Sequence, residues 1–180
     1  PLPEEDSQEN IVDTLYDFIN FIRRNPKLFV PILQKFQSNY IKNGYLNYLG
    51  YKIKLASGLN VLNNNIDLLC NMDSLTKLSK SSKLKVTLPD FFYQGNYKEY
   101  FLNEFAKIKE NYDYEDLDYF YCEEFGTGRN LATVGFCDSN LKETKLANLI
   151  LNPNFNHIFI SLFNEKVLFI VFGNEKEDEF

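Results

Sequence analysis

The order of the elements along the chain predicts an α+β fold, because helices come first and an antiparallel sheet with one inserted helix follows. Apolar residues recur at helical spacing through the first part of the chain, and after residue 118 the pattern changes to short runs of strand length. Near the C-terminus, two apolar runs are separated by only a few polar residues, which is typical of a hairpin. We therefore expect an α-β-α sandwich of three layers around a small, mainly antiparallel sheet.

Helices are expected throughout the first part of the chain. Pro26 is expected to end the first helix and Pro31 to begin the second, since proline is tolerated in the first turn of a helix but not in its interior. The stretch 43–51 contains glycine and several tyrosines and predicts a loop. The expected helical ranges are 11–25, 31–40, 58–69, 75–82 and 97–108.

The later part of the chain supplies the sheet. Residues 119–125 and 131–137 are rich in aromatic and β-branched side chains over strand lengths, and 141–151 is amphipathic enough for a helix. The runs 158–163 and 167–172 predict a hairpin at the centre of the sheet. No internal repeat or linker is visible, so we expect one domain over residues 1–174 and a solvated acidic tail over 175–180.

Composition limits the function. The chain has 180 residues, of which 44% are apolar, enough for one domain with a single core. Lys and Arg number 19 against 25 for Asp and Glu, and this negative balance argues against nucleic acid as a partner. No apolar run approaches the roughly 18 residues needed for a membrane span, so a soluble protein is expected. His157 is the only histidine, which excludes any mechanism or metal site that needs two imidazoles from this chain.

The cysteines point to neither a zinc site nor a disulfide framework. Cys70, Cys122 and Cys137 are odd in number, widely spaced and without a CxxC pair. Three buried thiols are expected. A single bridge between Cys122 and Cys137 is the alternative, which requires their strands to be neighbours.

Motifs in the C-terminal third indicate a family. Residues 128–133 read Gly-Arg-Asn-Leu-Ala-Thr, and residues 146–158 read Leu-Ala-Asn-Leu-Ile-Leu-Asn-Pro-Asn-Phe-Asn-His-Ile. They resemble the GENIA strand entry and the HRANILNPNFTHIG segment of the CAP superfamily, the cysteine-rich secretory, antigen 5 and pathogenesis-related-1 proteins, in the form shared by bacteria and protists. The closing hairpin fits the last two strands of that family. More weakly, residues 16–26 resemble the protist form of its first helix, and 55–58 resemble its TxEG segment.

The resemblance implies a central cleft with two histidines and two acidic residues that can hold a divalent metal. Lys83, Glu124, Arg129 and Lys145 stand at or near these places, and three of the four places depart from the pattern. A cation in place of a carboxylate repels a metal ion. The single histidine, His157, matches the THIG histidine, which is not part of the cleft set, and is expected to be structural. We therefore expect no metal, no cofactor and no catalytic residue.

Other catalytic arrangements have little support in the sequence. A Ser-His-Asp set lacks the GxSxG turn that presents a nucleophile, and nothing near the cysteines suggests an activated thiol. Glu123 and Glu124 are adjacent in a predicted strand and point to opposite faces. The glycine-rich turn 126–128 lacks the features of a phosphate-binding loop.

The first hypothesis is a non-enzymatic CAP-like domain that acts as a protein-interaction or structural module, with another protein or a larger assembly as its partner. Tyr45, Tyr48 and Tyr51 are the candidate interaction surface. A lipid- or sterol-binding CAP protein is the alternative, in which the aromatic segment 89–105 covers an apolar groove instead of packing on the core. An active hydrolase is the third possibility. The resemblance implies an extracellular or secretory location, with an intracellular assembly as the alternative.

Overall fold

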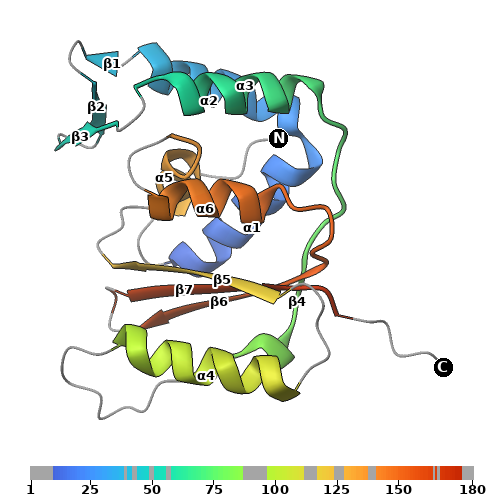
Figure 1. Cartoon of the computed structure of the whole chain (residues 1–180). Coiled ribbons are helices and arrows are strands. Elements are labelled where there is room, and N and C mark those ends of the chain that lie inside the picture. The colour runs from blue at the N-terminus through green and yellow to red at the C-terminus, as the bar shows by residue number, and fades with distance from the viewer. Residues whose placement is uncertain are drawn as a thin grey trace. The chain divides into compact units, whose positions relative to one another are not determined.

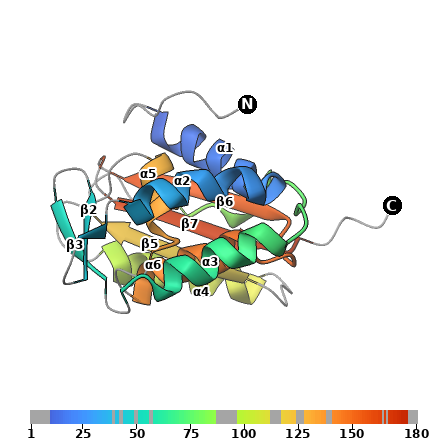
Figure 2. The same ribbon diagram turned by 90° about the horizontal axis from the view of Figure 1, so that it is seen from above.

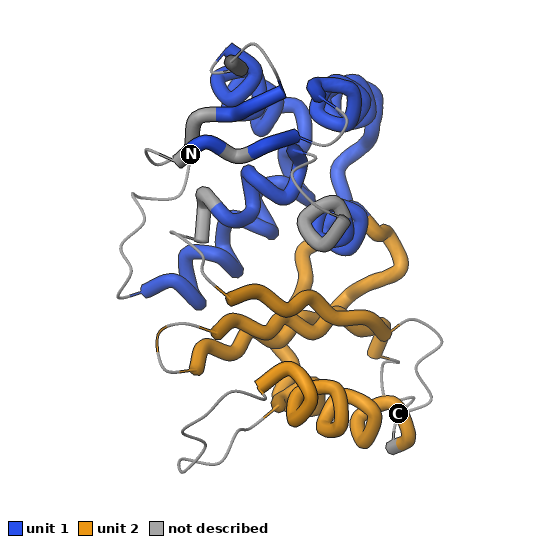
Figure 3. The backbone as a smooth tube through the Cα atoms, turned by 60° about the vertical axis from the view of Figure 1, so that its left-hand side comes forward, with its two compact units in different colours: residues 1–76, 126–151 blue, residues 77–125, 152–180 orange. Residues whose placement is uncertain are grey.

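The computed structural model describes residues 10–38, 40–41, 44–48, 51–55, 58–86, 97–111, 117–123, 128–137, 141–163, 165 and 167–175. The chain divides into two compact units, each built from two stretches of sequence (Figure 3). Unit 1 comprises residues 1–76 and 126–151, and unit 2 comprises residues 77–125 and 152–180. None of the described helices is long and apolar enough to cross a membrane.

Unit 1 is helical around α1 (Ile11–Arg24), which packs against α2 (Pro26–Ser38), α5 (Gly128–Val134) and α6 (Leu141–Ile150). Helix α3 (Asn60–Asn71) lies alongside α2 and runs in the opposite direction (Figure 2). The apolar residues of α1 recur at spacings of three and four and face the core; they are Ile11, Leu15, Phe18, Ile19 and Ile22. The first and third helices and the helix near residue 145 are thus confirmed.

The junction between α1 and α2 differs from the prediction. Pro26 is the first residue of α2, and Pro31 lies inside that helix, so the start expected at Pro31 was wrong. Proline fits the first helical position because its missing N–H has no intrahelical partner there. The carbonyl oxygen of Asn25 accepts hydrogen bonds from the backbone N–H groups of Leu28 and Phe29, at 3.0 and 3.3 Å, and these bonds form the first turn.

The tyrosine-rich stretch between α2 and α3 is a small antiparallel sheet instead of a loop. It comprises β1 (Tyr40–Ile41), β2 (Tyr45–Tyr48) and β3 (Tyr51–Lys54), in the order β1-β2-β3. Tyrosine and isoleucine favour strands, and their pairing outweighs the turn signal of the glycine. Gly44 has a φ of 82°, a left-handed conformation that glycine adopts without strain.

Two other expected elements were wrong. Residues 131–137, expected as a strand, form the end of α5 and the turn that follows it, and all seven are buried. A short run that is buried on every side carries no period by which helix and strand can be told apart. The helix expected over 75–82 is extended chain, followed by β4 (Ser79–Lys80) and a 3-10 turn, η2 (Ser82–Leu84).

Unit 2 is a mixed four-stranded sheet in the order β4-β6-β7-β5. The predicted hairpin is confirmed as β6 (His157–Phe163) and β7 (Val167–Gly173), and it occupies the centre of the sheet. Strand β5 (Leu117–Glu123) pairs antiparallel with β7, whereas β4 pairs parallel with β6. Every residue of β7 is buried, as expected of a central strand with an unbroken apolar sequence.

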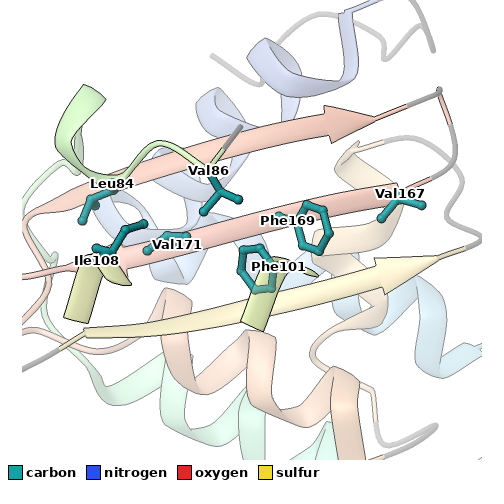
Figure 4. Close-up of a cluster of buried hydrophobic side chains, with 7 residues drawn as sticks. All are labelled: Leu84, Val86, Phe101, Ile108, Val167, Phe169 and Val171. Atoms are coloured by element: carbon teal, nitrogen blue, oxygen red, sulfur yellow. The ribbon is translucent and has the colours of Figure 1, made fainter. Parts of the chain in front are cut away.

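Helix α4 (Tyr97–Asn111) lies along one face of this sheet (Figure 1). Phe101 is fully buried and stacks on Phe169 of β7, with ring centroids 4.0 Å apart and an angle of 13° between the ring planes. The buried cluster joins the helix, the sheet, the end of η2 and the chain that follows it; its members are Leu84, Val86, Phe101, Ile108, Val167, Phe169 and Val171 (Figure 4). The structure thus confirms the α+β class and a mainly antiparallel sheet.

Candidate functional site

A network of polar side chains surrounds the carboxylate of Glu175, which follows the last strand of unit 2. Its other members are Ser81, just before η2, Lys83 within η2, and Asn156 and His157 at the start of β6. We call these five residues the Glu175 site. Strand β4 brings the segments together, because it pairs with the start of β6 and leads directly into η2.

Three side chains contact the two oxygens of the Glu175 carboxylate. The hydroxyl of Ser81 donates a hydrogen bond to Oε2 at 2.7 Å, and Nζ of Lys83 lies 2.7 Å from Oε1. Nε2 of His157 lies 3.5 Å from Oε2. The carboxylate is only 14% exposed, so these contacts replace much of its hydration.

The side chain of Asn156 binds the main chain of Glu175. Its Nδ2 donates to the carbonyl oxygen of Glu175, and its Oδ1 accepts from the Glu175 N–H, both at 2.8 Å. The backbone N–H of Asn156 donates to the carbonyl of Gly173 at 3.1 Å. The side-chain amide therefore continues, beyond the end of β7, the pairing that the two strands make through their backbones.

The charge state of Glu175 follows from these contacts. Burial alone would raise the pKa of its carboxyl, but the hydrogen bonds from Lys83 and Ser81 and the charges of His157 and Lys83 outweigh burial. The net effect lowers the pKa of Glu175 below its ordinary value of 4.5. Glu175 is therefore a carboxylate at neutral pH and pairs with a cation.

The site contains a serine, a histidine and a carboxylate, but their connections are not those of a hydrolase triad. A nucleophilic serine donates its proton to the imidazole, which the acid orients from the other side. Here the single proton of the Ser81 hydroxyl is directed at Glu175, and Nδ1 of His157 lies 2.6 Å from Oδ1 of Asn156. Both ring nitrogens thus face oxygen atoms of the network instead of the hydroxyl.

The predicted cleft positions fall in different parts of the chain. Lys83 lies in unit 2, where it contacts the same Glu175 carboxylate as His157 does. Arg129 lies in α5 and Lys145 in α6, two helices of unit 1 that contact each other. Glu124 lies outside the described residues. Within the described part of the chain, no group of three or more His, Cys, Asp or Glu residues is placed to hold a metal ion.

The predicted tyrosine surface lies on the small sheet of unit 1. Tyr45 is half-buried in β2, and Tyr48 of β2 is paired with Tyr51 of β3. The side chains of Tyr48 and Tyr51 are outside the described residues. They therefore remain candidates on the strength of the sequence.

The aromatic segment 89–105 is described from Tyr97 onward. In that part, Phe101 is buried in the core, and Tyr97 and Phe105 pack against the same cluster. Phe101 and Phe105 also contact the ring of Tyr119 on β5, with centroids 5.2 and 4.8 Å apart. These rings fill the space between α4 and the sheet, as expected of core residues.

Of the three thiols expected to be buried, only Cys137 is buried; Cys122 is half-buried and Cys70 is exposed. All three are thiols, so the bridge between Cys122 and Cys137 is not formed. Cys137 is not in a strand; it follows helix α5, where its sulfur lies 3.9 Å from the carbonyl of Thr133. Cys70 is exposed on α3 and not buried, although it follows Leu69 of the buried stripe in sequence.

Unit 1 contains a buried arginine that no pattern in the sequence singles out. Arg23 is completely buried, and it donates from Nε to the carbonyl of Thr76 at 2.9 Å and from Nη1 to the carbonyl of Ile150 at 2.8 Å. Its own carbonyl accepts from the N–H of Leu75 at 2.7 Å. Burial lowers the pKa of Arg23 to about 10, so the guanidinium is charged at neutral pH. Arg23 thus joins α1, the end of α6 and the extended segment after α3.

Comparison with known proteins gives no match: no family model fits the chain, and no curated protein or solved structure is detectably similar to it.

Proposed function

We propose that the chain is a divergent CAP-like domain that acts through protein contacts, in a fold whose metal cleft has been lost. The proposal rests on the motifs at 128–133 and 146–158 and on the α+β order of the elements. It includes the arrangement of helix, sheet and helix in three layers that the family has. Cationic residues, Arg129 and Lys145, stand where the family carries cleft residues.

The observation that supports a binding role over catalysis is the state of the only histidine. His157 is held between Asn156 and Glu175, and the serine beside it donates to the carboxylate. Lys83, near the place of a family histidine, forms an ion pair with the same carboxylate. A general base needs a free nitrogen near the proton that it removes, and this imidazole is engaged on both sides.

Lipid binding is the competing proposal, and it depends on the aromatic segment 89–105. The described rings of this segment pack on the sheet and favour a core role. The first proposal predicts a copurifying protein and the second predicts bound lipid, so one native purification can distinguish between them.

The test is a native purification of the endogenous protein after mild crosslinking. Copurifying proteins are quantified by mass spectrometry, and bound lipids are extracted from the same sample. We expect a protein partner in stoichiometric amount and lipid at the level of an unrelated control protein. Stoichiometric lipid without a protein partner would contradict the proposal and favour the lipid-binding alternative.

A further inference from the structure

We infer that Ser81, Lys83, Asn156 and His157 form a binding site for an acidic residue in an extended peptide, and that the chain's own Glu175 occupies this site in the structure. The inference deepens the proposed function, since it names one kind of contact that the domain makes with a partner. The ligand class is a peptide segment with a glutamate in extended conformation and further acidic residues around it.

The donors converge on one carboxylate from separate segments of the chain. Ser81 and Lys83 each take a different carboxylate oxygen at 2.7 Å, and His157 approaches the oxygen that Ser81 binds. A cation and a neutral donor placed on the two oxygens form a charge-assisted pair, which is stronger than a bond between neutral groups. The arrangement therefore selects a carboxylate over an amide of similar shape.

Asn156 recognises the backbone of the bound residue independently of its side chain. Its amide pairs with both the N–H and the carbonyl of Glu175, as a neighbouring strand would. Domains that bind an extended peptide by strand-like pairing use the same two parts, main-chain bonds for affinity and a side-chain site for specificity. Together, the amide and the three donors specify an extended residue with a carboxylate.

The position of Glu175 allows exchange with an external peptide. It lies beyond the end of β7, and the side chains of Lys83 and His157 are 46% and 24% exposed, so both can be reached from solvent. The residues after it, 176–180, are mostly acidic. A tethered segment has an effective concentration of the order of millimolar, so an external acidic peptide binds well only when the internal one is weakened.

The test uses the full chain and a fluorescent peptide with the sequence of residues 174–180, Asn-Glu-Lys-Glu-Asp-Glu-Phe. Binding is measured by fluorescence anisotropy to wild type and to Glu175→Ala, which removes the internal carboxylate from Ser81, Lys83 and His157. We expect the variant to bind at least about tenfold more tightly than wild type, which corresponds to roughly 1.4 kcal/mol. A peptide in which glutamine replaces the first glutamate should lose about the same factor.

Two lysine substitutions locate the binding. In the Glu175→Ala chain, Lys83→Met should weaken peptide binding about tenfold, because it removes the charged donor. Lys98→Met is the matched control; Lys98 is an exposed lysine of α4 in the same unit, and its loss should leave binding unchanged.

Equal binding by wild type and Glu175→Ala, or equal binding of the two peptides, would overturn the inference. If both Glu175→Ala and Glu175→Gln lose cooperative thermal unfolding, the carboxylate is a fixed part of the fold and the inference also fails. The native purification described above is independent of these outcomes. A captured protein partner without peptide binding removes this inference alone, whereas bound lipid with peptide binding removes the proposed function alone.

Discussion

Replacing Arg23 with methionine tests how the buried guanidinium contributes to unit 1. The hydrogen bonds that the substitution removes include those from Nε to the carbonyl of Thr76 and from Nη1 to the carbonyl of Ile150. Ile150 is the last residue of α6, so its carbonyl has no partner within the helix. Arg23→Met therefore leaves the carbonyl of Thr76 and the buried carbonyl of Ile150 without these donors, while keeping an apolar side chain in the space.

The expected cost follows from the bonds to a charged donor, each of which contributes about 1.5 to 3 kcal/mol. Methionine avoids the desolvation of a buried charge, which offsets part of the loss. We expect the free energy of unfolding to fall by about 3 kcal/mol, which corresponds to a decrease in Tm of roughly 6 to 12 °C for a chain of this size.

The assay is urea unfolding followed by far-ultraviolet circular dichroism, with thermal unfolding as a second measurement. Arg24→Met is the matched control, because Arg24 is the adjacent arginine and its side chain is exposed. Arg24→Met should change the free energy of unfolding by no more than about 0.5 kcal/mol. If Arg23→Met is as stable as wild type, or if Arg24→Met costs as much, the assigned role of Arg23 is wrong.

Other predictions concern the core, the Glu175 site and the thiols. Phe101→Ala should lower the free energy of unfolding in urea by about 3 to 5 kcal/mol, because it leaves a cavity beside the sheet. Leu68→Ala, at a residue that is 50% exposed, should lower it far less. Similar losses in the two variants would contradict the core assignment of Phe101. Folding lowers the pKa of Glu175, so the ionised carboxylate stabilises the folded state above the ordinary pKa of 4.5. This stabilisation is lost as the pH falls through the lower pKa of the folded state. Glu175→Gln should therefore flatten the dependence of unfolding free energy on pH below 4.5, and an unchanged dependence would contradict the network. Exposed Cys70 should react with a thiol reagent at least about tenfold faster than buried Cys137, and equal rates by peptide mapping would contradict their placement.

The elements that were predictable from the sequence are those whose apolar residues recur at a clear helical or strand spacing. Helices α1, α3 and α4 each bury one stripe of apolar residues at helical spacing. The hairpin of β6 and β7 was predictable because two apolar runs of strand length are joined by a short polar connection. In these segments the local pattern and the tertiary contacts favour the same structure.

The elements that were missed depend on distant partners or on uniform burial. The extended segment before β4 replaces a helix because its backbone is bound elsewhere, as the N–H of Leu75 is to the carbonyl of Arg23. Helix α5 lies in a run buried on every side, which hides its period.

The candidate site was only partly predictable. The count of one histidine was visible in the sequence, and so was the isolation of His157 from any nucleophile motif. The role of Glu175 was not, because an acidic residue near a chain end resembles a solvated tail. Its partners, Ser81 and Asn156, are distant in sequence and meet only through the pairing of β4 with β6.

A calorimetric titration of the chain with Zn²⁺ tests the central claim most directly, namely that a CAP-like fold has lost its metal cleft and works by binding. The account predicts no saturable heat at micromolar zinc, since one histidine cannot supply the two imidazoles of the family site. Saturable binding of one zinc ion per chain at micromolar affinity, lost in His157→Ala, would contradict it.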